Sequence, residues 1–267
     1  NIAKEVDEVI LLVGTNSDWE TEGNDRVDFN LPGEQNTLIE KVLDINPNAI
    51  IVLNTGSPVN MPWVNKAKSI LQSWYAGQEY GNALFEILTG IVNPSGKLPT
   101  TFPKQIEDTP AYSSYPGENL QMNYDEKLLI GYKWYDKKNI EPLFHFGHGL
   151  SYTDFKYSSL QIDKRGKNNF TCSFNIANIG DIAGFEISQC YISFNNCDNK
   201  EPIKKLQGFD KTFIKAGETE KVEIYLDAKS FSTWDTEAHQ WQIKKGMFDI
   251  LIGSSSNKII LKDSINL

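Results

Sequence analysis

The chain of 267 residues is poor in cysteine, histidine and methionine, and it has no long hydrophobic run. Its three cysteines, Cys172, Cys190 and Cys197, show no CxxC spacing, so we expect no zinc site. An odd count leaves at least one thiol free within a monomer. A Cys172–Cys190 bridge stays open as an alternative, but buried free thiols are the more common outcome.

Positive charge is also scarce, and this excludes a class of partner. The chain has 26 Lys and Arg against 35 Asp and Glu, a formal net charge of -9. A nucleic-acid-binding protein would carry a basic patch, so we expect no nucleic-acid partner. No apolar run is long enough to span a bilayer, so we expect no membrane partner. The start of the sequence shows no signal-peptide pattern. Because the sequence begins with Asn rather than Met, we expect an upstream part to be missing. A secreted or periplasmic location stays open.

Residues 1–103 alternate buried strands with helices. Apolar runs at residues 9–13, 49–53 and 69–74 predict strands, and apolar residues at helical spacing predict helices near 33–45 and 82–88. This order predicts parallel pairing through right-handed crossovers. Because three parallel strands are few for an α/β domain, we expect the rest of the sheet to lie outside this chain.

The loop after the first predicted strand, residues 19–26, is the most informative stretch. It contains two carboxylates, a tryptophan, a glycine and an Asp-Arg pair. Loops at the carboxyl ends of strands carry the ligand-facing residues of open α/β sheets. Carboxylates can perform acid–base chemistry, glycine lets the backbone approach a ligand, and tryptophan offers a face for a sugar. From these residues alone, a functional site and a solvated loop held by an Asp25–Arg26 ion pair are equally good interpretations.

The rest of the chain contains two segments with different sequence patterns. Residues 104–155 carry little regular structure and many aromatic residues, so we expect an extended linker that packs on both neighbouring domains. Residues 156–267 alternate apolar and polar positions in short runs separated by turn signals. This pattern predicts a β-sandwich of roughly seven strands.

A series of motifs runs in order along nearly the whole chain. They are Glu22-Gly23-Asn24-Asp25-Arg26, Leu31-Pro32-Gly33-Glu34-Gln35, Gly56-Ser57-Pro58-Val59, Trp74-Tyr75-Ala76-Gly77-Gln78-Glu79, Asn93-Pro94-Ser95-Gly96-Lys97-Leu98-Pro99, Gly131-Tyr132-Lys133-Trp134-Tyr135 and Phe144-His145-Phe146-Gly147-His148-Gly149-Leu150-Ser151-Tyr152-Thr153. Together they resemble glycoside hydrolase family 3. The C-terminal span, with Leu206-Gln207-Gly208-Phe209 and Ala216-Gly217-Glu218, is similar to the fibronectin type III-like domain of that family.

The resemblance implies an α/β + β architecture. Residues 1–103 would be the C-terminal part of an αβα sandwich domain with a parallel-rich sheet, 104–155 the linker, and 156–267 the fibronectin type III-like β-sandwich. It also implies a retaining, exo-acting β-glucosidase that hydrolyses terminal β-D-glucosyl residues of oligosaccharides or β-glucosides, without cofactor or metal. In this family the nucleophilic Asp lies in an N-terminal (β/α)8 barrel, and the acid/base Glu lies in a Glu-Gly motif. The barrel is expected outside this chain, so the fragment alone is expected to be inactive.

Glu22, in the Glu-Gly motif, is therefore the candidate acid/base, with a solvated loop glutamate as the alternative. Glu20 is the competing carboxylate and a candidate substrate-binding residue, because residues two apart in an extended loop face the same side. Asp18 lies in a Ser-Asp-Trp tripeptide like the one around the family's nucleophile. Its position in the acid/base loop is wrong for that role, so we interpret Asp18 as a rim residue.

The neighbouring residues are predicted to bind substrate or to shape this loop. Trp19 either lines the aglycone side or packs beneath the loop, and the sequence favours neither interpretation over the other. Gly23, Asp25 and Arg26 are interpreted as structural, with Asp25 and Arg26 forming a bidentate pair that fixes the backbone.

Two other function classes stay open. The first is a non-catalytic carbohydrate-binding or structural module, which exposed aromatic residues on the sandwich would favour. The sequence instead shows mostly Lys and Glu between the predicted core positions of the sandwich. The second is a structural remnant, a truncated gene product with no activity of its own. Within the same family a β-xylosidase also stays open, because sugar specificity is expected to depend mostly on the absent barrel.

Overall fold

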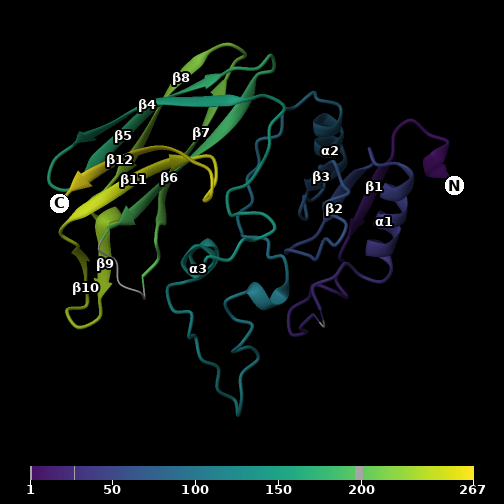
Figure 1. Ribbon diagram of the computed structural model, residues 1–267, viewed down its shortest axis with the longest axis horizontal. Helices are drawn as coiled ribbons and strands as arrows, with labels where there is room; N and C mark the ends of the chain where they lie inside the picture. Colours follow the sequence, from purple (N-terminus) through teal and green to yellow (C-terminus); the bar gives the residue numbers. More distant parts are fainter. Residues whose placement is uncertain (1, 27, 196–200) are drawn as a thin grey trace. The chain divides into compact units, whose positions relative to one another are not determined.

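The computed structural model describes residues 2–26, 28–195 and 201–267, which fall into two compact units (Figure 1). Unit 1 comprises Asn1–Leu88 and Phe102–Ile106, and unit 2 comprises Thr89–Thr101 and Glu107–Leu267. Most of the predicted linker thus clusters with the sandwich. The predicted domain boundaries at residues 103 and 155 stay predictions. Cys197 lies outside the described residues.

Unit 1 is built around a parallel sheet of three strands in the order β1-β2-β3. The strands are β1 (Ile10–Gly14), β2 (Ile50–Asn54) and β3 (Ser69–Gln72), and the helices are α1 (Gln35–Ile45) and α2 (Tyr80–Leu88), with a short 3-10 helix at Ile2–Lys4. The middle strand is apolar on both faces because Ile51, Val52 and Leu53 are all fully buried. The predicted parallel α/β arrangement of this part of the chain is confirmed.

Helix α1 follows from its sequence in a simple way. Its apolar residues recur every three or four positions, and Ile39 and Leu43 are buried. The helix ends at Asn46, whose backbone N–H donates to the carbonyl of Val42, and Pro47 follows. Proline disfavours a helical conformation in the residue before it, so the helix stops where the pattern predicts.

Unit 2 is dominated by a β-sandwich with two antiparallel sheets, of order β12-β11-β6-β7 and β4-β5-β8 (Figure 1). Their strands are β4 (Phe155–Lys164), β5 (Phe170–Asn178), β6 (Gly184–Phe194), β7 (Lys205–Ile214), β8 (Thr219–Leu226), β11 (Met247–Gly253) and β12 (Ile259–Asn266). Alternate side chains of both sheets meet in one apolar core, as in other sandwiches. Cys172 and Cys190 are buried in this core as free thiols.

Several elements of unit 2 were not predicted. A hairpin of β9 (Ser232–Asp235) and β10 (Gln240–Ile243) follows a 3-10 helix at Ala228–Phe231. The predicted linker contains a 3-10 helix at Ile106–Asp108 and the helix α3 (Tyr132–Lys138). At seven residues, α3 is too short to display a helical period in its sequence.

The segment around α3 covers part of the outer face of the four-stranded sheet. The ring of Tyr132 stacks on Phe146 with centroids 5.0 Å apart and meets Tyr191 of β6 edge-on at 5.7 Å. The amide of Gln189 on the same strand donates to the carbonyl of Gly147. Tyr191 and Gln189 are consequently buried although they point away from the sandwich core.

Candidate active site

The loop that leaves β1 makes two consecutive turns. In the first turn, the backbone N–H groups of Trp19 and Glu20 donate to the carbonyl of Asn16, at 3.0 and 2.9 Å. In the second, a bridge pairs Thr21 with Asn24 and places Glu22 and Gly23 in the middle of the turn. The side chain of Glu22 is exposed at this tip.

Gly23 makes the second turn possible. Its φ is +83°, in the left-handed region that residues with a Cβ rarely adopt. A Cβ at this position would meet no atom within 4 Å, so the constraint is the backbone conformation rather than a lack of space. The glycine after Glu22 therefore fixes the direction in which the loop presents that carboxylate.

Glu20 is surrounded by donors from three strand ends. Its Oε2 accepts hydrogen bonds from the hydroxyl of Tyr75 at 2.6 Å, the backbone N–H of Gly56 at 2.7 Å and the hydroxyl of Thr15 at 3.0 Å. Its Oε1 accepts a hydrogen bond from the hydroxyl of Ser57. These partners follow β1, β2 and β3, so the carboxylate ties the loop to the carboxyl edge of the sheet.

These bonds also set the charge state of Glu20. Burial acts to raise the pKa of the carboxyl, but hydrogen bonds from Ser57, Tyr75, Gly56 and Thr15 outweigh it. The net pKa of Glu20 lies below its usual value of 4.5, because these hydrogen bonds favour the ionised form. Burial and the neighbouring Glu20 together raise the pKa of the Tyr75 hydroxyl, which stays a donor.

Backbone conformation brings these partners within reach. Gly56 has no Cβ, and one built there would lie 2.7 Å from Oε2 of Glu20 and 2.8 Å from the ring of Tyr75. Trp74, two residues after the end of β3, adopts a φ of +55°, in the left-handed region that is uncommon for non-glycine residues. This turn precedes Tyr75, whose hydroxyl bonds to Glu20.

Arg26 forms its ion pair with Glu20 rather than with its neighbour in sequence. Its Nη1 lies 3.4 Å from Oε1 of Glu20 and donates to the hydroxyl of Ser57 at 2.7 Å. Asp25 is exposed, and the part of the chain that the structure describes gives it no ion pair. The expected Asp25–Arg26 clamp is therefore replaced by a Glu20–Arg26 clamp, because the loop turns Arg26 toward the sheet.

Trp19 is partly buried, and its indole nitrogen is buried without a hydrogen-bond partner among the described residues. Asp18 is exposed on the first turn, where its backbone N–H donates to the side chain of Asn16 at 3.1 Å. The two interpretations of Trp19, lining the aglycone side or packing beneath the loop, stay open.

A second clamp holds the end of β1 itself. The side-chain amide of Gln35, the first residue of α1, accepts from the N–H of Gly14 at 2.8 Å and donates to its carbonyl at 2.9 Å. Among the described strands β1 pairs only with β2, so these two hydrogen bonds satisfy the backbone of Gly14 on the open side of β1. The motif that ends in Gln35 thus sets the position from which the loop departs.

Metal-ligating side chains do not gather in the part of the chain that the structure describes. Within residues 2–26, 28–195 and 201–267, the structure contains no group of three or more His, Cys, Asp or Glu side chains able to hold a metal ion.

The helices of the described residues are all too short or too polar to cross a membrane.

Comparison with known proteins identifies the family. Residues 1–152 match the model of the glycosyl hydrolase family 3 C-terminal domain. The chain belongs to glycosyl hydrolase family 3. Residues 186–256 match a fibronectin type III-like domain. The family and the fold class that the motifs predicted are both confirmed.

The relatives and solved structures named here are β-glucosidases. The chain is 42% identical to thermostable β-glucosidase B of Acetivibrio thermocellus, and the match covers 99% of this chain and 36% of that protein. The β-glucosidase structure from Kluyveromyces marxianus superimposes with a TM-score of 0.95 at 36% identity, covering 100% of this chain and 32% of that one. β-Glucosidase 3B from Thermotoga neapolitana gives 0.91 at 34% identity, with 99% and 38% covered. The chain therefore spans about a third of the length of these relatives.

Sequence reasoning missed the residues that hold the loop in place. Thr15, Ser57 and Tyr75 were not proposed as site residues, although Ser57 and Tyr75 lie in the motifs that carry the family resemblance. The available signal was their position, because each follows a predicted parallel strand, and the carboxyl ends of such strands meet at one edge.

Proposed function

We propose that this chain is the C-terminal part of a retaining β-glucosidase in which Glu22 is the general acid/base. One observation carries this assignment: of the two glutamates in the loop, Glu20 is bonded to the strand ends and Glu22 is exposed at the tip of a turn. An acid/base must release and take up a proton at the glycosidic oxygen and then at water. A carboxylate already bonded by five donors is poorly suited to that exchange.

The nucleophile is assigned to a barrel domain outside this chain. Retaining glycosidases place the two carboxyl groups about 5–5.5 Å apart on either side of the scissile bond. The exposed tip leaves Glu22 accessible to a second domain that carries the nucleophile. β-Glucosidase is the favoured specificity because the relatives described above carry that name.

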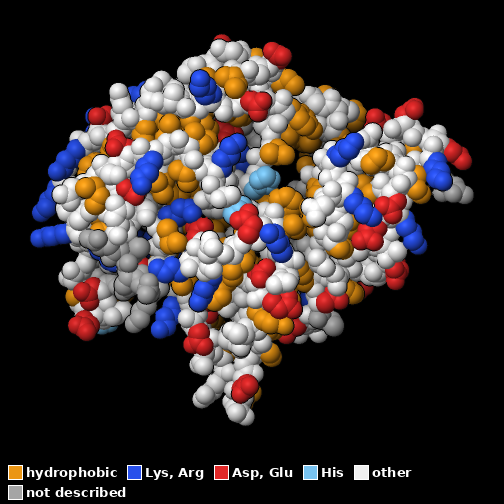
Figure 2. All heavy atoms as spheres, viewed as in Figure 1, with side chains coloured by type: hydrophobic (Ala, Val, Ile, Leu, Met, Phe, Trp, Pro, Cys, Tyr) orange, Lys and Arg blue, Asp and Glu red, His pale blue; other side chains and the backbone are white. Residues whose placement is uncertain are grey.

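Exposed apolar residues in unit 1 support a further covering element. Ile10 and Leu12 on β1, at an edge of the sheet, are 53% and 54% exposed, and Phe85 on α2 is 59% exposed. Hydrophobic side chains also reach the surface in several places on the face that Figure 2 presents. Exposed apolar surface of this kind marks contact sites, so we assign the β1 edge to the remainder of the αβα domain.

The test uses the protein in which this chain is joined to its barrel. Glu22→Ala should slow hydrolysis of unactivated β-glucosides by about 10²–10⁴-fold, the usual contribution of general acid–base catalysis. An aryl glucoside with a good leaving group needs little protonation, so the glucosyl-enzyme should form and accumulate. Azide should then restore turnover and give β-glucosyl azide.

Glu20→Ala is the matched control. It should lower activity by disordering the loop, without azide rescue and without a change in leaving-group dependence. Azide rescue of Glu20→Ala and not of Glu22→Ala would assign the acid/base role to Glu20. The isolated chain of 267 residues should not hydrolyse an aryl β-glucoside at all.

A further inference from the structure

A groove in unit 2 has not been assigned any role. Its volume is about 400 Å³, within the range of small-molecule sites. It lies between β7 and β8, which are edge strands of the two sheets, and the 3-10 helix and hairpin after β8 complete its wall. The side chains that carry the argument are Gln207, Tyr225, Asp227, Lys229 and Trp241.

Aromatic rings are exposed along this groove. Trp241 is 51% exposed and Tyr225 58%. Trp234 pairs with Trp241 across the hairpin at a centroid distance of 5.7 Å and is 49% exposed. The ammonium of Lys229 lies 4.7 Å from the centre of the Trp241 ring and holds the indole in place. Large aromatic rings that are about half exposed offer a surface on which an apolar face of a ligand can stack.

Polar groups beside the rings have unused hydrogen-bonding capacity. The side chain of Gln207 has no hydrogen-bond partner among the described residues, and its amide can both donate and accept. Oδ1 of Asp227 accepts from the backbone N–H and hydroxyl of Ser230, which leaves Oδ2 facing no donor among the described residues. A pyranose matches this set, because its C–H face is apolar and each of its hydroxyls both donates and accepts.

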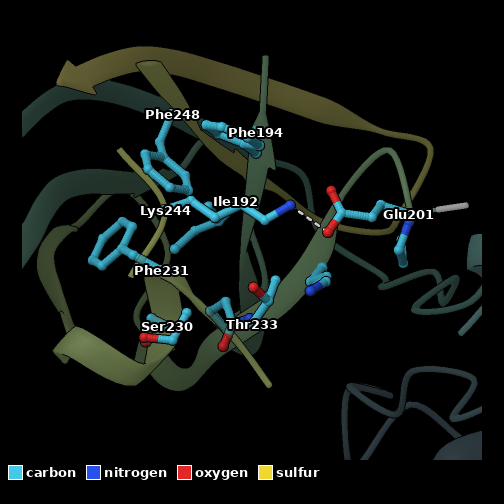
Figure 3. A pocket seen from close by; sticks show the side chains of 12 residues that line it. Ile192, Phe194, Glu201, Ser230, Phe231, Thr233, Lys244 and Phe248 are labelled. Atoms are coloured by element: carbon cyan, nitrogen blue, oxygen red, sulfur yellow. Dashed lines mark hydrogen bonds and ion pairs between the residues drawn. The ribbon is translucent and has the colours of Figure 1, made fainter. Parts of the chain in front are cut away.

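The adjoining inner pocket limits where a ligand can sit and which charge it can carry. It shares Lys205, Gln207, Ser230 and Ser232 with the groove, but its volume is only about 30 Å³. In Figure 3, Lys244 and Glu201 point toward one another in this pocket and form an ion pair. These charges compensate each other, and the outer groove is lined by one carboxylate, Asp227, and two lysines, Lys205 and Lys229. The groove therefore has no strong net charge, so we assign it a neutral ligand, and the anionic probe below tests the effect of the excess lysine.

We propose that this groove binds a neutral gluco-oligosaccharide with β-linkages, with a sugar ring stacked on Trp241 and hydroxyls bonded to Gln207 and Asp227. The choice of glucose rests on the proposed function, whereas the groove uses none of the residues of the Glu22 loop. Such a site would hold a longer glucan on the same polypeptide that contributes to its hydrolysis.

The test is binding to the full chain of 267 residues, without catalysis. Cellohexaose and laminarihexaose are titrated while tryptophan fluorescence and heat are recorded, and oligogalacturonate serves as an anionic probe. Trp241→Ala should weaken binding of the neutral hexasaccharides by about tenfold or more, which corresponds to about 1.4 kcal/mol. Gln207→Ala should also weaken it, since it removes polar contacts and leaves the ring in place.

Phe209→Ala is the matched control. Phe209 is an aromatic residue of β7 that is 67% exposed and lines neither the groove nor the inner pocket. It should bind the hexasaccharides like the unmodified chain, and circular dichroism should show the same fold for all three variants. Absence of hexasaccharide binding, binding that survives Trp241→Ala, or binding of oligogalacturonate alone would each overturn the proposal. None of these outcomes bears on azide rescue at Glu22, so the two proposals fail separately.

Discussion

Two glutamates separated by a single residue have very different surroundings. Glu20 accepts hydrogen bonds from residues that follow all three strands of unit 1, while Glu22 is exposed. The sequence argument placed both on one side because it assumed an extended loop. The loop instead turns at Asn16 and again between Thr21 and Asn24, so alternation does not apply. Local turn geometry of this kind depends on tertiary hydrogen bonds that a sequence pattern does not display.

The first prediction concerns Glu20→Gln. The pKa of Glu20 is lowered in the folded chain, so its ionised form stabilises the fold above about pH 4.5. This contribution is lost as the pH falls through the folded pKa. Glu20→Gln should therefore lower the free energy of unfolding by about 1–3 kcal/mol at pH 7, because the amide cannot accept all of these bonds. The difference between the variant and the unmodified chain should shrink as the pH is lowered below 4.5 toward pH 3.

Urea unfolding at both pH values measures this effect. Glu22→Gln is the control, and as an exposed substitution it should change the free energy of unfolding by less than about 0.5 kcal/mol. An equal loss from Glu20→Gln at pH 7 and pH 3 would contradict the assignment of a stabilising ionised carboxylate.

The second prediction compares two glycines of unit 1. Gly23→Ala should destabilise the loop by about 1–2 kcal/mol, because φ of +83° is unfavourable for a residue with a Cβ. Gly81 lies in α2 with no atom within 4 Å of a Cβ built on it, so Gly81→Ala should raise stability by about 0.5–1 kcal/mol. Thermal unfolding of both variants measures the difference. Equal effects of the two substitutions would show that backbone conformation is not the constraint at Gly23.

Secondary-structure elements were predicted best where burial dictates the sequence. β2 is apolar from Ile50 to Leu53 because both faces are covered, and β8 alternates because only one face meets the core. Helix α3 and the β9–β10 hairpin were missed for the opposite reason. α3 is short, and the hairpin exposes Trp234 and Trp241 instead of burying them, so neither shows the expected period.

The third prediction tests how an extended segment is attached to the sandwich. Lys97 lies 3.4 Å from Glu186 of β6 in an ion pair with side chains only 11% and 5% exposed, and Tyr157 donates to the same carboxylate. Glu186→Leu should cost about 3–5 kcal/mol, because it leaves the Lys97 ammonium buried and unpaired. The double variant Lys97→Met/Glu186→Leu should recover part of this loss, since no unpaired charge remains.

The exposed pair Lys221–Glu223 supplies the matched control. Its side chains are 60% and 51% exposed, so Glu223→Leu should change the free energy of unfolding by less than about 1 kcal/mol. Denaturant unfolding of the three variants separates the outcomes. A double variant less stable than Glu186→Leu alone would mean that the charge of Lys97 is not what destabilises the single variant.

For the whole molecule, the features that could be predicted are those whose sequence patterns lie within these 267 residues. The family, the parallel sheet and the sandwich were all predicted, because each is recorded in patterns within these residues. The chain spans about a third of its relatives, and an exposed apolar edge remains at β1. We expect sugar specificity to depend mostly on the barrel that we propose outside this chain, so the substrate assignment rests on the names of the relatives.

The last prediction concerns the stability of unit 2 as a fragment. The sandwich has its own apolar core, so residues 156–267 should fold alone. In that fragment, however, Tyr191 and Gln189 would lose the cover provided by Tyr132 and Gly147. Fully burying one large side chain is worth about 1.5–3 kcal/mol, so a fragment of residues 89–267 should be more stable than 156–267 by at least about 2 kcal/mol.

Urea unfolding of the two fragments measures this difference, and Tyr132→Ala in the longer fragment serves as its control. That variant should lose most of the added stability, because the ring that stacks on Phe146 and meets Tyr191 is removed. Limited proteolysis should cut within residues 104–130 before it cuts the sandwich, since that span contains none of the strands of the two sandwich sheets. If both fragments unfold at the same urea concentration, the segment around α3 contacts the sheet without adding to its stability, and the prediction is wrong.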